Sequence, residues 1–230
     1  KLEFQFYQIN TKIPLQKAGG KQFRWGRQSL IPSSSENSER LSLEKEVRVP
    51  SDLKGLKLIA AKPEVAEMVR MAGGTPVAIP IGDTYMALER GLVEGQFTHF
   101  PALGAFGTMP LMKSHTIIGG SGIEMPFGAH VMNMNTWNKL SPDLHQIFED
   151  AVAWYIEQEV YTNVPRMAAG LLKAAEDQGR VVSHLTPEEI KEWTDLAKVV
   201  AEAKIAELEA KGVPAKSVYQ ELQQLIANYK

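Results

Sequence analysis

Short apolar runs alternate with segments of helical pattern between residues 50 and 135, and this alternation limits the folds open to the chain. The runs have the length and composition of strands at 56–61, 77–79, 92–97, 116–118 and 130–134. The connections between them are short. Alternating strands and helices with short connections favour an α/β fold, in which helices cover a sheet.

Start and stop signals for helices lie between the first strands. Pro63 suits the first turn of a helix, where its missing N–H is not needed, and Gly73 and Gly74 would end that helix. Asp83 suits the cap of a second helix that ends before Gly91. The spacing therefore predicts helices over 63–71 and from 84 to about 90.

The pattern changes to a helical period from residue 136 onwards. Ser141 and Pro142 open a long helix, and Pro165 should kink or break it near Thr162. The stretch 186–189 fits a capping box with a proline in the first turn. Gly212 and Pro214 would separate that helix from a last one. We expect residues 136–230 to be helical, with the sheet confined mainly to 50–135.

Residues 1–49 differ from the rest of the chain. Alternating apolar residues at 2–9 suggest a strand, and the serines at 33–35 suggest a loop. The basic and aromatic residues at 21–27 are interpreted as a solvated loop with one packed tryptophan, because a nucleic-acid groove needs a wider patch. The expected division is thus 1–49, partly irregular; 50–135, an α/β lobe; and 136–230, helical.

Composition excludes several classes of function. The net charge of −2 gives no global basic field for nucleic acid, and the absence of cysteine excludes disulfides and thiolate chemistry. No apolar run approaches the roughly 18 residues of a transmembrane helix. The chain begins at Lys1 and shows no signal peptide, so its compartment has to be inferred from other features.

Enzyme signatures are weak. The five histidines show no metal-ligand spacing, and no G-x-S-x-G elbow occurs. The glycine-rich stretch from Gly119 lacks the lysine of a phosphate loop, and the carboxylates have no evident acid/base partner. We therefore expect no catalysis, no metal site and no cofactor.

Four motifs occur in one order: D-L-K-G-L-K from 52, G-G-T-P-V from 73, Y-M-A-L-E-R-G-L-V-E-G from 85 and W-N-K-L-S-P-D-L from 137. In this order and spacing the chain resembles the DctP-like solute-binding proteins of tripartite ATP-independent periplasmic (TRAP) transporters, over residues 46–228. The resemblance implies a periplasmic-binding-protein type II-like lobe with a helical C-terminal half packing across the lobes. It also implies a periplasmic protein that binds a small organic solute and delivers it to TRAP membrane permease subunits.

The resemblance assigns the ligand contacts position by position. The family's carboxylate-binding arginine corresponds to Ile59, a polar contact three residues on to Lys62, and a frequent asparagine to Thr98. A polar turn corresponds to Asp83, and Phe127 lies where the family lines its cleft. His99 follows Thr98 at the same strand end, where ligands bind in α/β sheets. The alternatives are that Ile59 completes a buried strand, Lys62 is solvated and Asp83 only caps its helix.

Two departures from the family pattern matter. Without the arginine, either Lys62 or another cation supplies the charge, or the ligand is not a simple carboxylate. Only 49 residues precede Pro50, so we expect most of the N-terminal lobe to be lacking. The first expectation is a solute-binding protein for an organic acid. The alternative is a sensor or protein-interaction domain on the same fold, and an enzyme has no motif behind it.

Overall fold

A central sheet organises the chain in a computed structural model, which describes residues 23–25, 40–43, 45–118 and 131–228. Six strands of the described chain form this sheet, in the order β4 (Thr75–Val77), β3 (Lys57–Ile59), β5 (Gly95–Thr98), β2 (Arg40–Leu43), β6 (Ser114–Ile117) and β8 (Val181–His184). β3 runs parallel to β4 and β5, and β6 runs parallel to β8. β2 lies between β5 and β6 and is antiparallel to both.

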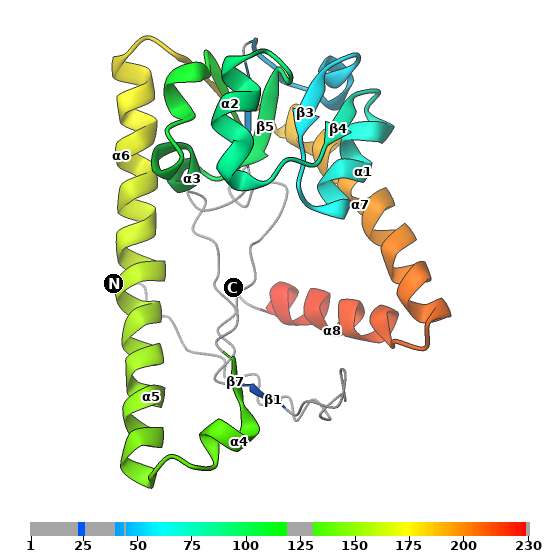
Figure 1. Cartoon of the computed structure of the whole chain (residues 1–230). Coiled ribbons are helices and arrows are strands. Elements are labelled where there is room, and N and C mark those ends of the chain that lie inside the picture. Colours follow the sequence, from blue (N-terminus) through cyan, green and yellow to red (C-terminus); the bar gives the residue numbers. More distant parts are fainter. Residues whose placement is uncertain (1–22, 26–39, 44, 119–130, 229–230) are drawn as a thin grey trace.

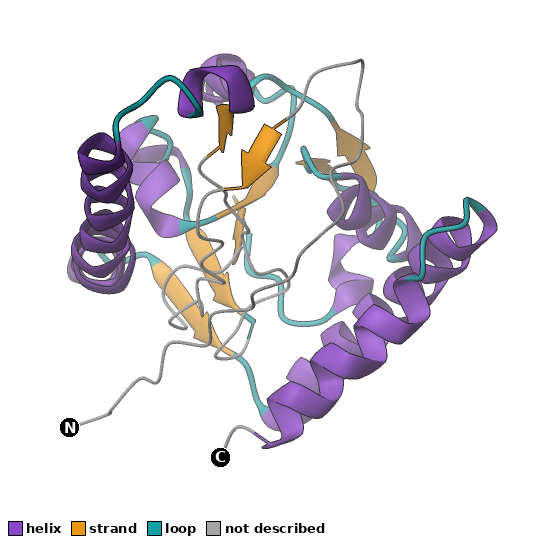
Figure 2. Cartoon of the chain, turned by 90° about the horizontal axis from the view of Figure 1, so that it is seen from below, coloured by secondary structure: helices purple, strands orange, loops and turns teal. Residues whose placement is uncertain are grey.

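Helices cover both faces of the sheet and make three layers (Figure 2). On one face α1 (Pro63–Met71) and α7 (Pro187–Ala210) pack on a core that includes Leu58 and Trp193. On the other face lie α2 (Thr84–Glu89), α3 (Phe100–Ala105) and α6 (Val164–Asp177). Consecutive residues of a strand point to opposite faces. Leu58 and Ile59 accordingly belong to different apolar clusters.

A second, smaller unit lies below this α/β body in Figure 1. It contains β1 (Phe23–Trp25), which pairs antiparallel with β7 (Val131–Asn133), and the short helix α4 (Met134–Trp137). The chain passes between the two sheets from β1 to β2, again from β6 to β7, and a third time along a long helix. The two units are therefore joined by several covalent connections.

The long helix is continuous across the position where a break is predicted. α5 (Pro142–Tyr155) leads into a π-helical stretch (Ile156–Asn163), and α6 follows it without a turn (Figure 1). Pro165 falls in the first turn of α6, where its missing N–H does no harm. The wider π-helical turns absorb the change in hydrogen bonding at the proline, so the outcome is a change of helix type and not a break.

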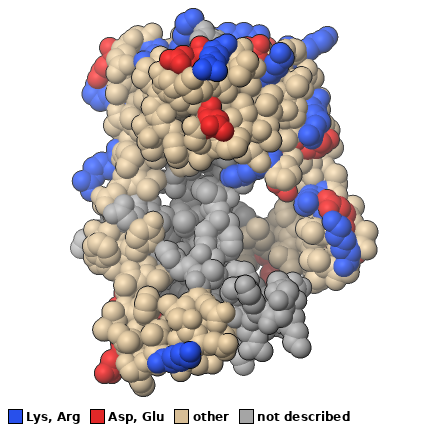
Figure 3. Space-filling view, in the orientation of Figure 1, with Lys and Arg blue, Asp and Glu red and all other residues tan. Residues whose placement is uncertain are grey.

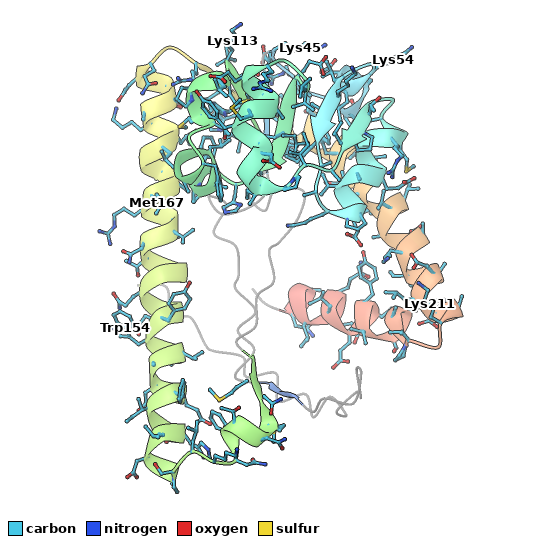
Figure 4. The ribbon with its side chains drawn as sticks, viewed as in Figure 1. Lys45, Lys54, Lys113, Trp154, Met167 and Lys211 are labelled. Atoms are coloured by element: carbon cyan, nitrogen blue, oxygen red, sulfur yellow. The ribbon has the colours of Figure 1, made fainter. Side chains whose placement is uncertain are left out.

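The outer side of the long helix carries large apolar side chains. Trp154 is 62% exposed and Met167 is 49% exposed. Figure 4 shows both pointing away from the α/β body. α7 leaves the body on the opposite side and is followed by α8 (Ala215–Asn228).

The α/β class is confirmed, and most predicted elements are present within two or three residues of their expected bounds. Two strands of the main sheet lie outside the predicted 50–135 segment. β2 comes from residues 1–49, and β8 comes from the segment predicted to be helical. Neither was predicted, because a four-residue strand hardly changes the hydrophobic pattern around it. β7 is a strand as predicted but belongs to the small sheet. The predictions for residues 2–9 and 33–35 lie outside the described residues.

Candidate binding site at the strand ends

The carboxyl ends of the parallel strands bring two basic side chains to one edge of the sheet. Ile59 of β3 pairs with Gln96 of β5. Lys62 follows Ile59 by three positions, and His99 follows Gln96 by three. Past these strand ends the Lys62 ammonium lies close enough to His99 to act on the pKa of its ring. The register therefore juxtaposes Lys62 and His99.

Each of these residues occupies the N-cap position of the helix that follows its strand. Lys62 has φ −93° and ψ 137° and precedes α1, and His99 has φ −96° and ψ 151° and precedes α3. Pro63 excludes a helical conformation for Lys62, which explains the extended backbone there. Two matched turns thus hold an ammonium and an imidazole at the same edge.

Burial and the neighbouring charge set the protonation state of His99 beside Lys62. Both are half-buried. Burial, and then the neighbouring Lys62 ammonium, lower the pKa of His99 below its usual 6.5. His99 is therefore neutral at pH 7, and Lys62 carries the positive charge of the pair.

Thr98 completes this group. It is the last residue of β5, is partly exposed, and pairs through its backbone with Arg40 at the start of β2. Its hydroxyl group can donate and accept hydrogen bonds. Of the predicted site residues, the structure thus brings Lys62, Thr98 and His99 together at the strand ends.

Ile59 and Asp83 lie differently. The Ile59 side chain is 5% exposed and packs with Leu88 of α2, Val93 and Met112. It completes the core beneath α2, as one of the two interpretations of the sequence held. Asp83 is exposed, ends a 3-10 turn (Ile81–Asp83) and stands at the N-cap of α2. Phe127 lies outside the described residues.

The predicted capping role of Asp83 is wrong in its detail. Its carboxylate makes no hydrogen bond to the first turn of α2. The backbone is already helical there, with φ −99° and ψ −4°, because the 3-10 turn runs directly into the helix. A capping side chain needs an extended backbone to reach back to the free N–H groups. The carboxylate of Asp83 is thus available at the surface.

The edge that carries the site faces the small unit. Lys54 and Lys113 precede β3 and β6, and Figure 4 places them at the upper edge of the body. The carboxyl ends of these strands therefore lie at the lower edge, on the side of β7 and α4 (Figure 1). A solute bound at Lys62 and His99 would lie between the two units.

Polar residues behind the edge were missed by the sequence reasoning. Gln96 donates a hydrogen bond of 2.8 Å to Thr108, and both side chains are almost fully buried. On β6, which lies two strands away from β5 in the sheet, His115 is fully buried, its ring lies 5.2 Å from that of Phe100, and burial and then Arg180 lower its pKa to about 4. These contacts hold β5 and the start of α3. Gln96 lies within the predicted strand 92–97, and its polar side chain in a buried run was the available signal.

Within the described ranges, no three His, Cys, Asp or Glu side chains converge as metal ligands. No helix in the part of the chain that the structure describes is both long and apolar enough to cross a bilayer.

Comparison with known proteins identifies the family. The profile of bacterial extracellular solute-binding proteins, family 7 (DctP), matches residues 37–208. The chain belongs to this family. An uncharacterised protein of Haemophilus influenzae is 26% identical over 144 residues, which are 62% of this chain and 43% of that protein. The chain thus spans less than half of this curated relative.

Solved structures show the same fold. A TRAP periplasmic solute-binding protein of Desulfovibrio salexigens is 25% identical, with a TM-score of 0.65 over 84% of this chain and 59% of that one. One of Rhodoferax ferrireducens with bound malonate is 19% identical, with a TM-score of 0.72 over 84% and 61%. One of Haemophilus influenzae with bound L-gulonate is 18% identical, with a TM-score of 0.72 over 88% and 62%. The family-7 chain therefore has the type II periplasmic-binding fold and spans under two thirds of these proteins.

Proposed function

We propose that this family-7 chain is the extracytoplasmic solute-binding protein of a TRAP transporter, which captures a small organic acid in the periplasm and delivers it to membrane permease subunits. The observation that carries the proposal is the pairing of Lys62 with His99 at the carboxyl edge of the sheet. Solutes bind at this edge in open α/β sheets. The proposed role includes no catalytic step.

The proposed site consists of Ile59, Lys62, Asp83, Thr98, His99 and Phe127. Lys62 supplies the charge that attracts a carboxylate, and Thr98 and His99 supply hydrogen bonds of fixed direction. Ile59 contributes through the position of its backbone, since its side chain belongs to the core. Asp83 stands apart as an exposed carboxylate. It can accept hydrogen bonds from hydroxyl groups of a solute, whereas it would repel the carboxylate of that solute.

The first test is binding of malonate, L-gulonate and benzoate, measured by calorimetry. In Lys62→Met the ammonium is lost and the apolar stem is kept. A hydrogen bond to a charged group contributes about 1.5–3 kcal/mol. We therefore expect the Kd of the best ligand to rise roughly ten-fold to a hundred-fold.

Lys54→Met is the matched control, because Lys54 lies at the opposite edge of the same sheet (Figure 4). Its Kd should equal that of the unmodified chain. Equal losses in both variants would indicate a general charge effect and count against the site. Failure of all three acids to bind the unmodified chain would count against the function.

One observation favours the second candidate function, a sensor or protein-interaction domain. Val218, Leu222 and Leu225 of α8 are 60%, 42% and 44% exposed and recur at helical spacing. A domain of this kind would signal through α8 and need no permease. Leu222→Glu should then abolish its signalling interaction, whereas for a transport protein the solute affinity and delivery should not change.

A further inference from the structure

We propose that solute capture at this site is coupled to protonation of His99, so that Lys62 and His99 together take the place of the family's arginine as a two-cation grip on an acid group. This inference rests on the proposed function and names how the same site is regulated. It requires that both side chains reach one ligand and that no described acid already neutralises His99.

The geometry meets the first requirement. Lys62 and His99 occupy matched positions beyond a paired backbone position of β3 and β5. Both stand at helix N-caps on an extended backbone, and both are half-buried. An ammonium is a point charge that holds one oxygen without fixing its direction. An imidazolium N–H beside it supplies a directed second contact, as the guanidinium of arginine does within one side chain.

The charged groups around His99 meet the second requirement. From the turn between β3 and α1, Lys62 is the group that acts on the His99 pKa. At the N-cap of α2, Asp83 is exposed and is not among the groups that shift that pKa. From β6, His115 faces the buried side of Phe100 and is neutral at pH 7. Within the described residues, His99 thus has a cation beside it and no compensating anion.

The sign of the effect follows from these contacts. In the free chain the pKa of His99 is lowered, so the ring is neutral at pH 7. A bound carboxylate offsets the repulsion from Lys62 and favours the imidazolium, which raises that pKa. When a bound ligand raises the pKa of a protein group, that group takes up a proton on binding, and the affinity for the ligand is greater at lower pH. The affinity should therefore fall as pH rises through the pKa of His99 in the complex.

The test uses benzoate, whose own carboxyl group stays ionised in the range of interest. Binding is measured by calorimetry at about pH 5.5 and about pH 8, in buffers of different ionisation enthalpy. If binding raises the pKa by about one unit, the affinity should differ by up to roughly ten-fold between the two conditions. Proton uptake should reach about half a proton per ligand at a pH midway between the pKa values of His99 in the free chain and in the complex.

His99→Gln keeps a hydrogen-bond donor but cannot titrate, and its benzoate affinity should be the same at both pH values. His184→Gln is the control, because His184 is an exposed histidine at the end of β8. This variant should retain the pH dependence. A nuclear magnetic resonance titration of the His99 ring in the unmodified chain, with and without benzoate, gives the same answer without any variant. There the pKa should rise on binding.

The outcomes separate the inference from the function beneath it. If benzoate binds with the same affinity at both pH values, or if His99→Gln keeps the pH dependence, the inference is overturned and the proposed function stands. If neither benzoate, malonate nor L-gulonate binds at either pH, the proposed function falls and the inference with it.

Discussion

At the scale of single residues, the side chain of Ile59 belongs to the core, at a position that we propose contributes to the site through its backbone. The resemblance to family 7 implies an arginine at this position. In this chain the isoleucine packs beneath α2, with 5% of its side chain exposed. In the proposed site, Lys62 in the next turn supplies the charge that the resemblance assigns to position 59.

Ile59→Arg tests this exchange. A guanidinium in the cluster with Leu88 and Met112 would be buried without a partner, so the free protein should lose about 2–5 kcal/mol of unfolding free energy. Added malonate or benzoate should restore part of the thermal midpoint, since the new side chain then has an anion to pair with. Ile59→Met, an apolar exchange, should cost under about 1.5 kcal/mol. An unchanged midpoint for the arginine variant would contradict the burial of Ile59.

At the scale of elements, the segment after β2 is tied to α7 by a polar cluster centred on Arg48. Its guanidinium contacts Glu189 at 2.6 and 2.8 Å and Glu46 at 3.0 Å. Ser183 of β8 donates to Glu46 at 2.7 Å, and the ring N–H of Trp193 donates to the Arg48 carbonyl at 2.8 Å. Glu189 also completes the capping box of α7 with Thr186. The cluster therefore joins the segment that follows β2 to β8 and α7.

Acid should weaken this cluster. The Arg48 hydrogen bond, followed by that from the Thr186 backbone, lowers the pKa of Glu189 below 4.5. Hydrogen bonds from Ser183 and then Arg48 lower the pKa of Glu46 below the same value. A lowered carboxyl pKa gives stability that is present above the unfolded-state value and is lost as pH falls through the folded-state value. The thermal midpoint should thus decrease as the pH is lowered below about 4.5.

Arg48→Met tests whether this cluster causes the loss of stability in acid. This variant should have a lower midpoint at pH 7 and a smaller further loss in acid, because its glutamates have lost their main partner. Arg70→Met is the control, since Arg70 pairs with Glu67 on the exposed side of α1. Circular dichroism melts at several pH values measure both. Parallel acid curves for the Arg48 variant and the unmodified chain would rule the cluster out.

Local elements could be predicted from the sequence more accurately than contacts between residues that lie far apart in the chain. Pro63 and the glycines at 73 and 74 bound α1 at the residues expected, and the capping box opens α7 as predicted. These signals act over a few residues and can be read directly. β2 and β8 were missed because short strands are stabilised by neighbours far along the chain. The contact between Arg48 and Glu189 spans 141 positions, which no local pattern encodes.

The candidate site was predictable to a similar degree. The resemblance assigned Lys62 and Thr98 to the site and the strand-end rule added His99, and their role in binding stays a prediction. The pairing of Lys62 with His99 depends on the register of β3 against β5, which hydrophobic periodicity does not fix. The packing of Ile59 depends on which face α2 covers. Both follow from tertiary structure and not from the order of residues alone.

At the scale of the whole molecule, stability is concentrated in the α/β body. The three apolar clusters lie on the two faces of its sheet. Uncharged surface covers much of the face that carries α2, and Lys and Arg side chains gather at its rim (Figure 3). α8 stands away from the body (Figure 1), and its described side chains are exposed or only partly buried. Helix α8 should therefore add little to folding.

Truncation at Gly212 tests this unequal distribution of stability. Removal of α8 should change the thermal midpoint little, because an exposed helix leaves no cavity behind it. Trp193→Ala is the contrasting change within α7. Trp193 is 1% exposed, packs edge-on to Phe97 at 6.4 Å and bonds the Arg48 carbonyl, so its loss should cost about 3–5 kcal/mol. Hydrogen exchange should follow the same order, fast in α8 and slow around Trp193. A large loss on truncation would show instead that α8 is part of the folding unit, and that its exposed apolar residues face a partner on which the body depends.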